Sequence, residues 1–241
     1  MLLLKWSRRQ RRPWEDSPCR AGRGRACWTD AACYHVMNRG QNRASIFADD
    51  NDRQYFLALL ARYSQRFDVR LYHYCLMSNH FHLLLQLAQP RQLSRLMASM
   101  LVAYVRYFQR RYRFAGHVFQ GRFKSPAIEA EPYLLSCGRY IERNPVAANL
   151  VQDAWQYCWS SCRAYALGVN DTLLASNPWY EQWSPDPTRR QVLWQEFVRG
   201  PDPKEEVIQA DDWAIGEPEF RRRLHRPESR AVPRGAGRPR G

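Results

Sequence analysis

The sequence lacks any long apolar run. No stretch approaches the roughly 18 consecutive apolar residues that a membrane-spanning helix needs. At the N-terminus, "MLLLKWSRRQRRPW" offers only a short leucine run before the arginines begin, too short for the apolar core of a secretory signal. We therefore expect a cytoplasmic protein with no membrane partner.

The sequence also lacks an even set of cysteines, since it has seven. Those from Cys33 onward lie within apolar or helical patterns, which is typical of reduced thiols in a cytoplasm rather than of a disulfide framework. Cys158 and Cys162 lack a second pair at zinc-site spacing. This argues against a structural zinc.

Acidic residues are outnumbered: 23 Asp and Glu face 37 Lys and Arg, so the net charge is +14 and the pI is about 9.8. Such an excess points to a polyanionic partner, with nucleic acid the first interpretation and an anionic membrane surface the second. With 241 residues, 45% hydrophobic and 25% charged, the chain can otherwise form one large or two small globular domains.

Both ends are basic and without periodicity. Residues 1–30 and the Arg, Pro and Gly-rich residues 219–241 are expected to be flexible basic arms. Between them, hydrophobic periodicity predicts alternating strands and helices. The expected elements are a strand at Cys33–Gly40, a helix at Asp52–Phe67, a hairpin of Val69–Ser78 and His80–Leu87, a helix at Arg91–Phe114, an extended segment at Gly116–Ala130 and a helix at Glu131–Asn144 ended by Pro145.

This order, with hairpin-paired strands and long helices between them, predicts an α+β fold. We expect an antiparallel sheet with helices packed on it, related to ferredoxin-like arrangements. The remainder, rich in Trp and Tyr, is expected to be a partly helical C-terminal extension.

Two histidines interrupt a strand that is otherwise apolar, "MSNHFHLLLQL". Side chains alternate in a strand, so His80 and His82 share one face while Phe81 points to the core. Their Cα atoms would be roughly 6.5 Å apart, which lets both imidazoles reach one cation. A lone histidine is more often an ordinary surface or core residue, and we interpret the others in that way: His35, His73, His117 and His225.

Two imidazoles do not complete a site for a hard ion such as Mg²⁺ or Mn²⁺, which prefers oxygen donors. In "RYIERNP", Tyr140 and Asn144 are four residues apart and so share one helical face. If that face covers the histidines, Asn144 could be the third ligand and Tyr140 could attack a phosphodiester. A phenol becomes a useful nucleophile when a cation or a base favours the phenolate. The alternative for Tyr140 is a core aromatic.

Five segments, in this order, resemble one family: "YHVMNRGQNRASIF", "YCLMSNHFHLLLQ", "GHVFQGRFKS", "YLLSCGRYIERNPVAANLV" and "WSSCRAY". Over about Tyr34–Tyr165 the chain is similar to the REP-associated tyrosine transposases, within the single-tyrosine HUH or IS200-like transposases. The resemblance implies that His80 and His82 are the metal-binding pair, that Asn144 completes the metal site and that Tyr140 is the nucleophile.

The resemblance further implies cleavage of single-stranded DNA at short hairpin-forming repeats, with a 5′-phosphotyrosine and a free 3′-hydroxyl. It implies Mg²⁺ or Mn²⁺ as cofactor, a bacterial, nucleoid-associated location, and a monomer or homodimer. The expected domains are a basic arm (1–30), a catalytic domain (31–165), an extension (166–218) and a basic tail (219–241).

Two basic segments are candidates for DNA contact. "QGRFKS" combines cations with an aromatic ring and could clamp phosphates and stack an unpaired base, although its phenylalanine could equally belong to the core. "NRGQNR" follows the first strand. The candidate DNA-binding residues are Arg39, Arg43, Arg122, Phe123, Lys124 and Ser125. Two other functions stay open: a non-catalytic DNA- or RNA-binding protein, and an RNA-processing hydrolase.

Overall fold

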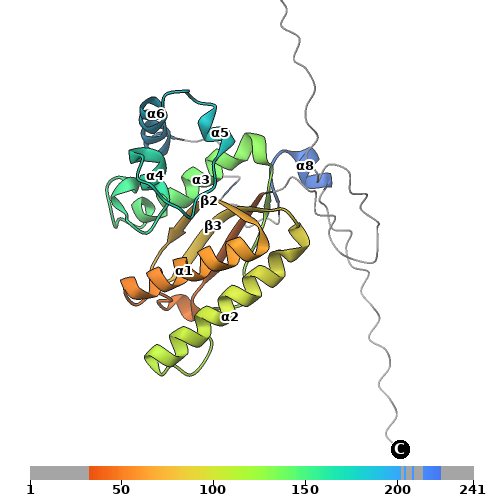
Figure 1. Cartoon of the computed structure of the whole chain (residues 1–241), viewed down its shortest axis with the longest axis vertical. Coiled ribbons are helices and arrows are strands. Elements are labelled where there is room, and N and C mark those ends of the chain that lie inside the picture. Colours follow the sequence, from red (N-terminus) through yellow and green to blue (C-terminus); the bar gives the residue numbers. More distant parts are fainter. Residues whose placement is uncertain (1–32, 202–203, 205–207, 209–213, 224–241) are drawn as a thin grey trace, which may run out of the picture.

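A five-stranded sheet with helices on both faces forms the centre of the protein (Figure 1). The computed structural model describes residues 33–201, 204, 208 and 214–223. The strand order is β2-β3-β1-β4-β5, antiparallel except that β4 and β5 run parallel. The strands are β1 (Cys33–Arg39), β2 (Val69–Leu76), β3 (His80–Leu87), β4 (Ala127–Ile128) and β5 (Ala214–Ile215).

Helices follow the strands in the predicted order. The α-helices are α1 (Asp50–Phe67), α2 (Leu93–Tyr112), α3 (Ala130–Ala147), α4 (Cys162–Leu167), α5 (Pro178–Glu181), α6 (Pro187–Arg199) and α8 (Pro218–Arg223). Short 3-10 turns are η1 (Gln41–Arg43), η2 (Pro90–Gln92) and η3 (Ala154–Gln156). No helix among the described residues combines the length and apolarity needed to cross a bilayer.

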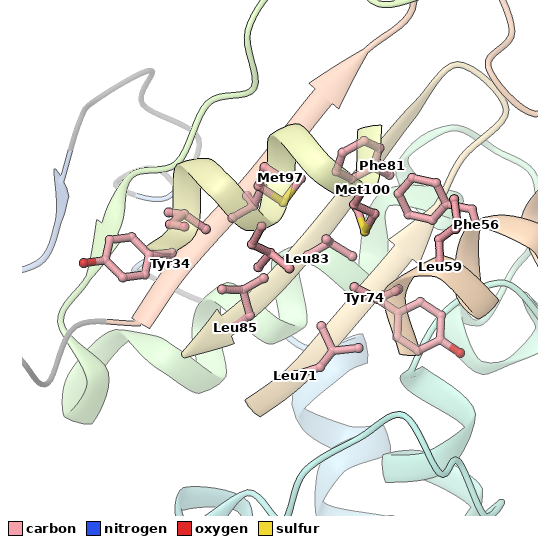
Figure 2. Close-up of a cluster of buried hydrophobic side chains, with 14 of the residues drawn as sticks. Tyr34, Phe56, Leu59, Leu71, Tyr74, Phe81, Leu83, Leu85, Met97 and Met100 are labelled. Atoms are coloured by element: carbon pink, nitrogen blue, oxygen red, sulfur yellow. The ribbon is translucent and has the colours of Figure 1, made fainter. Parts of the chain in front are cut away.

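Helices α1 and α2 cover one face of the sheet, over the main core (Figure 2). The odd-numbered side chains of β3, such as Phe81, Leu83 and Leu85, point to this face as predicted. They meet the apolar stripe of α2, in which Met97 and Met100 are fully buried. Asp49 caps the start of α1 by accepting a hydrogen bond from the Asp52 amide. This face is an apolar interior.

Helix α3 crosses the opposite face, over β2, β3 and β1. A second, smaller cluster lies beneath it and includes Leu84 of β3 with Cys137 and Ile141 of α3. The prediction that Pro145 ends this helix is wrong, because α3 continues to Ala147 with Pro145 inside it. Pro145 lacks the N–H that would bond the Ile141 carbonyl, and the Asn144 side chain supplies a donor to that carbonyl instead.

The chain after α3 builds a third cluster of its own, which we call the C-terminal module (residues 154–200). Trp194 of α6 and Tyr165 of α4 are buried at its centre. The module lies beside α3 (Figure 1). It begins before the expected domain boundary at 165, since Ala154 belongs to its core.

Strand β2 departs from simple alternation at one point. Its pairing with β3 shifts register between Leu71 and His73, a β-bulge. Leu71 therefore packs under α1 and α2, while Cys75 and Met77 face α3. Simple alternation would place His73 on the same face as Leu71, but His73 lies against Gly138 of α3 instead.

The predicted N-terminal arm lies outside the described residues, as does the tail from residue 224 onward. The first part of the predicted tail, up to Arg223, is helical in α8, and Phe220 is buried there against the main core. The α+β fold expected from the sequence, an antiparallel sheet with helices packed on it and a partly helical extension, is confirmed.

Candidate functional site

The two histidines of β3 lie at the start of the strand, on the face covered by α3. Their ring centroids are 5.0 Å apart, with the ring planes nearly perpendicular. His82 is buried, with 5% of its surface exposed, whereas His80 is half-buried at the edge. The pair thus stands between the interior and the solvent.

His80 is held in one tautomer by its neighbour. Its Nδ1 lies 2.6 Å from Asn79 Oδ1. Asn79 Nδ2 donates to the Arg43 carbonyl at 3.2 Å, so the amide must present its oxygen to the ring. His80 then carries its proton on Nδ1 and keeps a lone pair on Nε2, the arrangement that a metal-binding histidine requires.

Asn144 presents its oxygen to that lone pair. Its Nδ2 donates to the carbonyls of Tyr140, at 3.0 Å, and Ile141, at 3.2 Å. The amide oxygen is therefore turned outward and lies 3.4 Å from His80 Nε2. Neither atom carries a proton to share in this arrangement, so the two acceptors converge on one point and would both be satisfied by a cation between them.

Tyr140 lies beside the same point, one helical turn before Asn144. Its half-buried ring is 6.0 Å from the ring of His82 and 5.9 Å from that of His35, packed edge-on against both. The structure thus brings together all four residues that the sequence singled out for chemistry: His80, His82, Tyr140 and Asn144.

His35 also belongs to this group, and the sequence reasoning missed it. It lies on β1, fully buried, with Nε2 2.9 Å from His82 Nδ1. For His82 Nε2 to keep a lone pair, His82 must donate this hydrogen bond and His35 must carry its own proton on Nδ1. That Nδ1 has no hydrogen-bond partner among the described residues. His35 is on a separate strand, so no spacing in the sequence links it to the pair.

The imidazoles of the site are kept neutral. Burial lowers the pKa of His35 to about 3. Burial, followed by the neighbouring His35, His80 and Arg39, places the pKa of His82 well below its usual value. Burial and, less strongly, Arg39 lower the pKa of His80, while the Asn144 oxygen opposes them because it would accept a hydrogen bond from the protonated ring. Neutral imidazoles keep the lone pairs that metal binding needs.

The donor set fits a hard divalent cation that takes only part of its coordination shell from the protein. No group of three or more His, Cys, Asp or Glu side chains with metal-binding geometry occurs within the described part of the chain. Two imidazole nitrogens and the Asn144 oxygen therefore make an incomplete shell. Mg²⁺ and Mn²⁺ accept such a site because they retain water or take substrate oxygens.

The candidate DNA-binding segments run side by side along β1. Arg39 is exposed and opposite His80 in the sheet. Lys124 pairs with Met37, which itself pairs with His82. Exposed Arg43 and Arg122 and half-buried Ser125 lie in the same two segments.

Phe123 is placed differently from its neighbours. It packs against the main core under α1 and α2. This favours the core interpretation of Phe123 over base stacking, and it leaves the cations as the groups that border the site.

Comparisons with known proteins identify a family and a fold. Residues 29–144 match the family model of IS200-like transposases. The solved structure of a REP-associated tyrosine transposase bound to a REP hairpin is similar to this chain, with a TM-score of 0.52 and 16% identity over 65% of this chain and 93% of that one. No curated protein matches. The resemblance to this family is confirmed, and the structural likeness, at such low identity, shows the fold.

Proposed function

We propose that this chain, whose residues 29–144 match the IS200-like transposases, is a metal-dependent single-strand DNA endonuclease and strand transferase acting on hairpin-forming repeat DNA. One observation carries the proposal: Asn144 and Tyr140, from α3, lie against the histidine pair of β3. A phenol, an amide oxygen and two neutral imidazoles at one point form a site for phosphoryl transfer rather than for packing alone.

His80, His82 and Asn144 would hold a Mg²⁺ or Mn²⁺ ion. The preset tautomer of His80 and the fixed amide of Asn144 support this role, since both lone pairs are aimed before any ion arrives. When bound, such an ion polarises the non-bridging oxygens of a phosphodiester and stabilises the charge that builds in the transition state.

Tyr140 would act as the nucleophile. Its phenolic oxygen forms a bond to phosphorus while the bond from phosphorus to the 3′ oxygen breaks. The products are a 5′-phosphotyrosine and a 3′-hydroxyl, and the phenol proton passes to solvent while the leaving oxygen gains one. The exchange conserves one phosphoester bond, so it needs no ATP, and the 3′-hydroxyl can later attack the phosphotyrosine to rejoin strands.

Tyr133 is a weaker candidate for this role. It lies two turns earlier on α3, is buried, and donates its hydroxyl to Glu217 at 3.0 Å. Burial and this carboxylate raise the pKa of Tyr133, which opposes formation of a phenolate.

Arg39, Arg43, Arg122 and Lys124 would contact the phosphates of the DNA beside the cleavage point, with Ser125 at the end of their segment. Arg39 lies opposite His80, which supports a contact close to the reacting phosphate. The solved neighbour is bound to a REP hairpin, which favours hairpin DNA as the partner here. The protein would act in the cytoplasm, as a monomer or a homodimer.

Incubation of the purified protein with hairpin oligonucleotides in Mn²⁺ tests the proposal. We expect a covalent protein–DNA adduct that resists denaturation and is absent in EDTA. Tyr140→Phe should abolish it, a loss of at least about 10⁴-fold, because the phenol oxygen itself forms the bond. Tyr133→Phe is the matched control and should retain the adduct.

The results contradicting this function are equally specific. Hairpin binding without an adduct in any divalent ion would indicate a non-catalytic binder. Turnover of matched RNA without a protein-linked product would indicate a hydrolase. An adduct that survives Tyr140→Phe would assign the nucleophile to another residue.

A further inference from the structure

Helix α3 carries a second polar face, beside the one that holds Tyr140 and Asn144. This face begins at Arg139, and Glu142 and Arg143 follow it by three and four residues, so the three side chains share one side of the helix. That side is about 130° around the helix axis from Tyr140 and Asn144. Their side chains reach the C-terminal module. The proposed function assigns them no role.

Glu142 is the centre of this face and is fully buried. Its Oε1 accepts hydrogen bonds from Ser161 Oγ at 2.6 Å and from His73 Nδ1 at 2.8 Å, and its Oε2 accepts one from Trp194 Nε1 at 2.9 Å. A buried carboxylate is tolerated only when such donors replace its water. The donors come from β2, from the segment before α4 and from α6, so one side chain of α3 joins three separate parts of the fold.

Arg139 and Arg143 attach the same face to the end of α6. Arg139 Nε donates to the Phe197 carbonyl at 2.8 Å, and the same side chain also bonds the Gly200 carbonyl. Arg143 donates to the Val198 carbonyl at 2.6 Å. The last carbonyls of a helix have no partners within it, so the two guanidinium groups complete α6 while they fix α3.

These bonds determine the rotation of α3 about its own axis. The helix is also pressed against β2, since a Cβ on Gly138 would lie 2.5 Å from His73 Nε2. A roll of about 10° would move a tyrosine hydroxyl by more than about 1 Å, because the side chain extends far beyond the roughly 2.3 Å radius of the Cα atoms. A misplacement of about 1 Å can cost on the order of 100-fold in rate.

We infer that the C-terminal module is a brace for α3 and that Glu142 is a positioning residue, which sets Tyr140 and Asn144 against His80 and His82 without touching them. The inference rests on the proposed function for its catalytic consequence. The match to the transposase family ends at residue 144, whereas Ser161, Trp194 and the end of α6 lie beyond it. The module would therefore contribute to cleavage without supplying a reacting group.

Glu142→Gln tests the brace. Glutamine keeps the shape but turns an N–H₂ group toward at least one of the existing donors. We expect the adduct to form at least 10-fold more slowly and to need at least three-fold more Mn²⁺ for half-maximal rate, while affinity for the hairpin in EDTA stays within two-fold. Tyr165→Phe is the control, since it removes a buried hydrogen bond of the same module that goes to the Tyr72 carbonyl on β2 instead of to α3.

Arg143→Met serves if Glu142→Gln does not fold, because it keeps the apolar stem of a half-buried side chain and removes its two hydrogen bonds to α6. We expect a rate reduction of about three-fold. Equal rate losses in Glu142→Gln and Tyr165→Phe, in proportion to their loss of thermal stability, would overturn the inference, as would a full rate in Glu142→Gln.

Amide hydrogen exchange separates the brace from the proposed function. In Glu142→Gln the amides of Ile141 and Asn144 should exchange at least 10-fold faster than in the wild type, and in Tyr165→Phe they should not. If the wild type forms no adduct, the proposed function fails, and exchange still decides whether the module holds α3. Unchanged exchange in Glu142→Gln would refute the brace by itself.

Discussion

The two faces of the central sheet differ in what they bury. Under α1 and α2 the side chains are apolar, and Phe81, Leu83 and Leu85 of β3 are fully buried there. Under α3 the same strand presents His80 and His82. Residues adjacent in sequence therefore have opposite roles, since alternation sends one to the interior and the next to the candidate site. The apolar face under α1 and α2 supplies most of the buried apolar surface that stabilises the fold. The face under α3 can therefore hold polar groups.

The face under α3 is not simply a polar surface. Leu84 and Ile141 bury an apolar layer beside the histidines, and the Glu142 network lies further around the same helix, where it reaches His73 of β2. Burial there lowers the pKa of the histidines and keeps them neutral. The difference between the faces is thus that this one buries a group of polar side chains, most of them hydrogen-bonded to one another, whereas the other face buries few.

The largest expected effect contrasts two neighbouring residues. Phe81→Ala should lower the free energy of unfolding by about 3–5 kcal/mol, because it leaves a cavity in the main core. His80→Ala, on the opposite face and half-buried, should cost no more than about 1 kcal/mol but abolish adduct formation. Urea unfolding followed by fluorescence measures the first quantity. If the two variants were destabilised equally, the idea that one face stabilises the fold and the other carries the candidate site would be wrong.

A pH titration of stability sharpens the comparison. The folded pKa of His35 is about 3, whereas an unfolded histidine titrates near 6.5. As pH falls below about 6.5 the unfolded chain takes up protons first, so stability, complete above that pH, is lost down toward pH 3. In EDTA, His35→Leu should reduce the slope of unfolding free energy against pH by up to about 1.4 kcal/mol per pH unit.

The control for that titration is Val36→Ala, which is as buried as His35 but faces α1 and α2. It should lower stability by about 2 kcal/mol at every pH and leave the slope unchanged. If His35→Leu left the slope unchanged, the pKa of His35 would be the same in the folded and the unfolded chain.

The smallest effect concerns the residue that orients His80. Asn79→Ala removes the acceptor for His80 Nδ1, so the ring loses its fixed tautomer. We expect the Mn²⁺ concentration for half-maximal adduct formation to rise about 10- to 100-fold, with little change in thermal stability. Ser78→Ala, at an exposed neighbouring position, is the control and should behave as wild type. An unchanged Mn²⁺ requirement in Asn79→Ala would show that the ring is oriented by other contacts.

Local patterns predicted the framework because they report on burial alone. The alternation in β3 and the stripe from Leu93 to Phe108 in α2 both reflect one apolar face, and the structure buries those faces as expected. Patterns failed where a particular side-chain contact accompanied the departure. The bulge at His73 occurs where the His73 ring bonds Glu142 of α3, which is distant in sequence, and α3 continues past Pro145 where the neighbouring Asn144 side chain bonds the Ile141 carbonyl.

The sequence by itself determined the order of elements, the two faces of β3 and the pairing of His80 with His82 and of Tyr140 with Asn144, because each of these follows from the period of a strand or a helix. Only the tertiary structure decided that α3 lies over the histidines and that His35 from β1 joins them. It also decided that Glu142 bonds α3 to the C-terminal module. The physical reason is that periodicity fixes which side chains share a face, whereas hydrogen bonds between distant segments fix which faces meet.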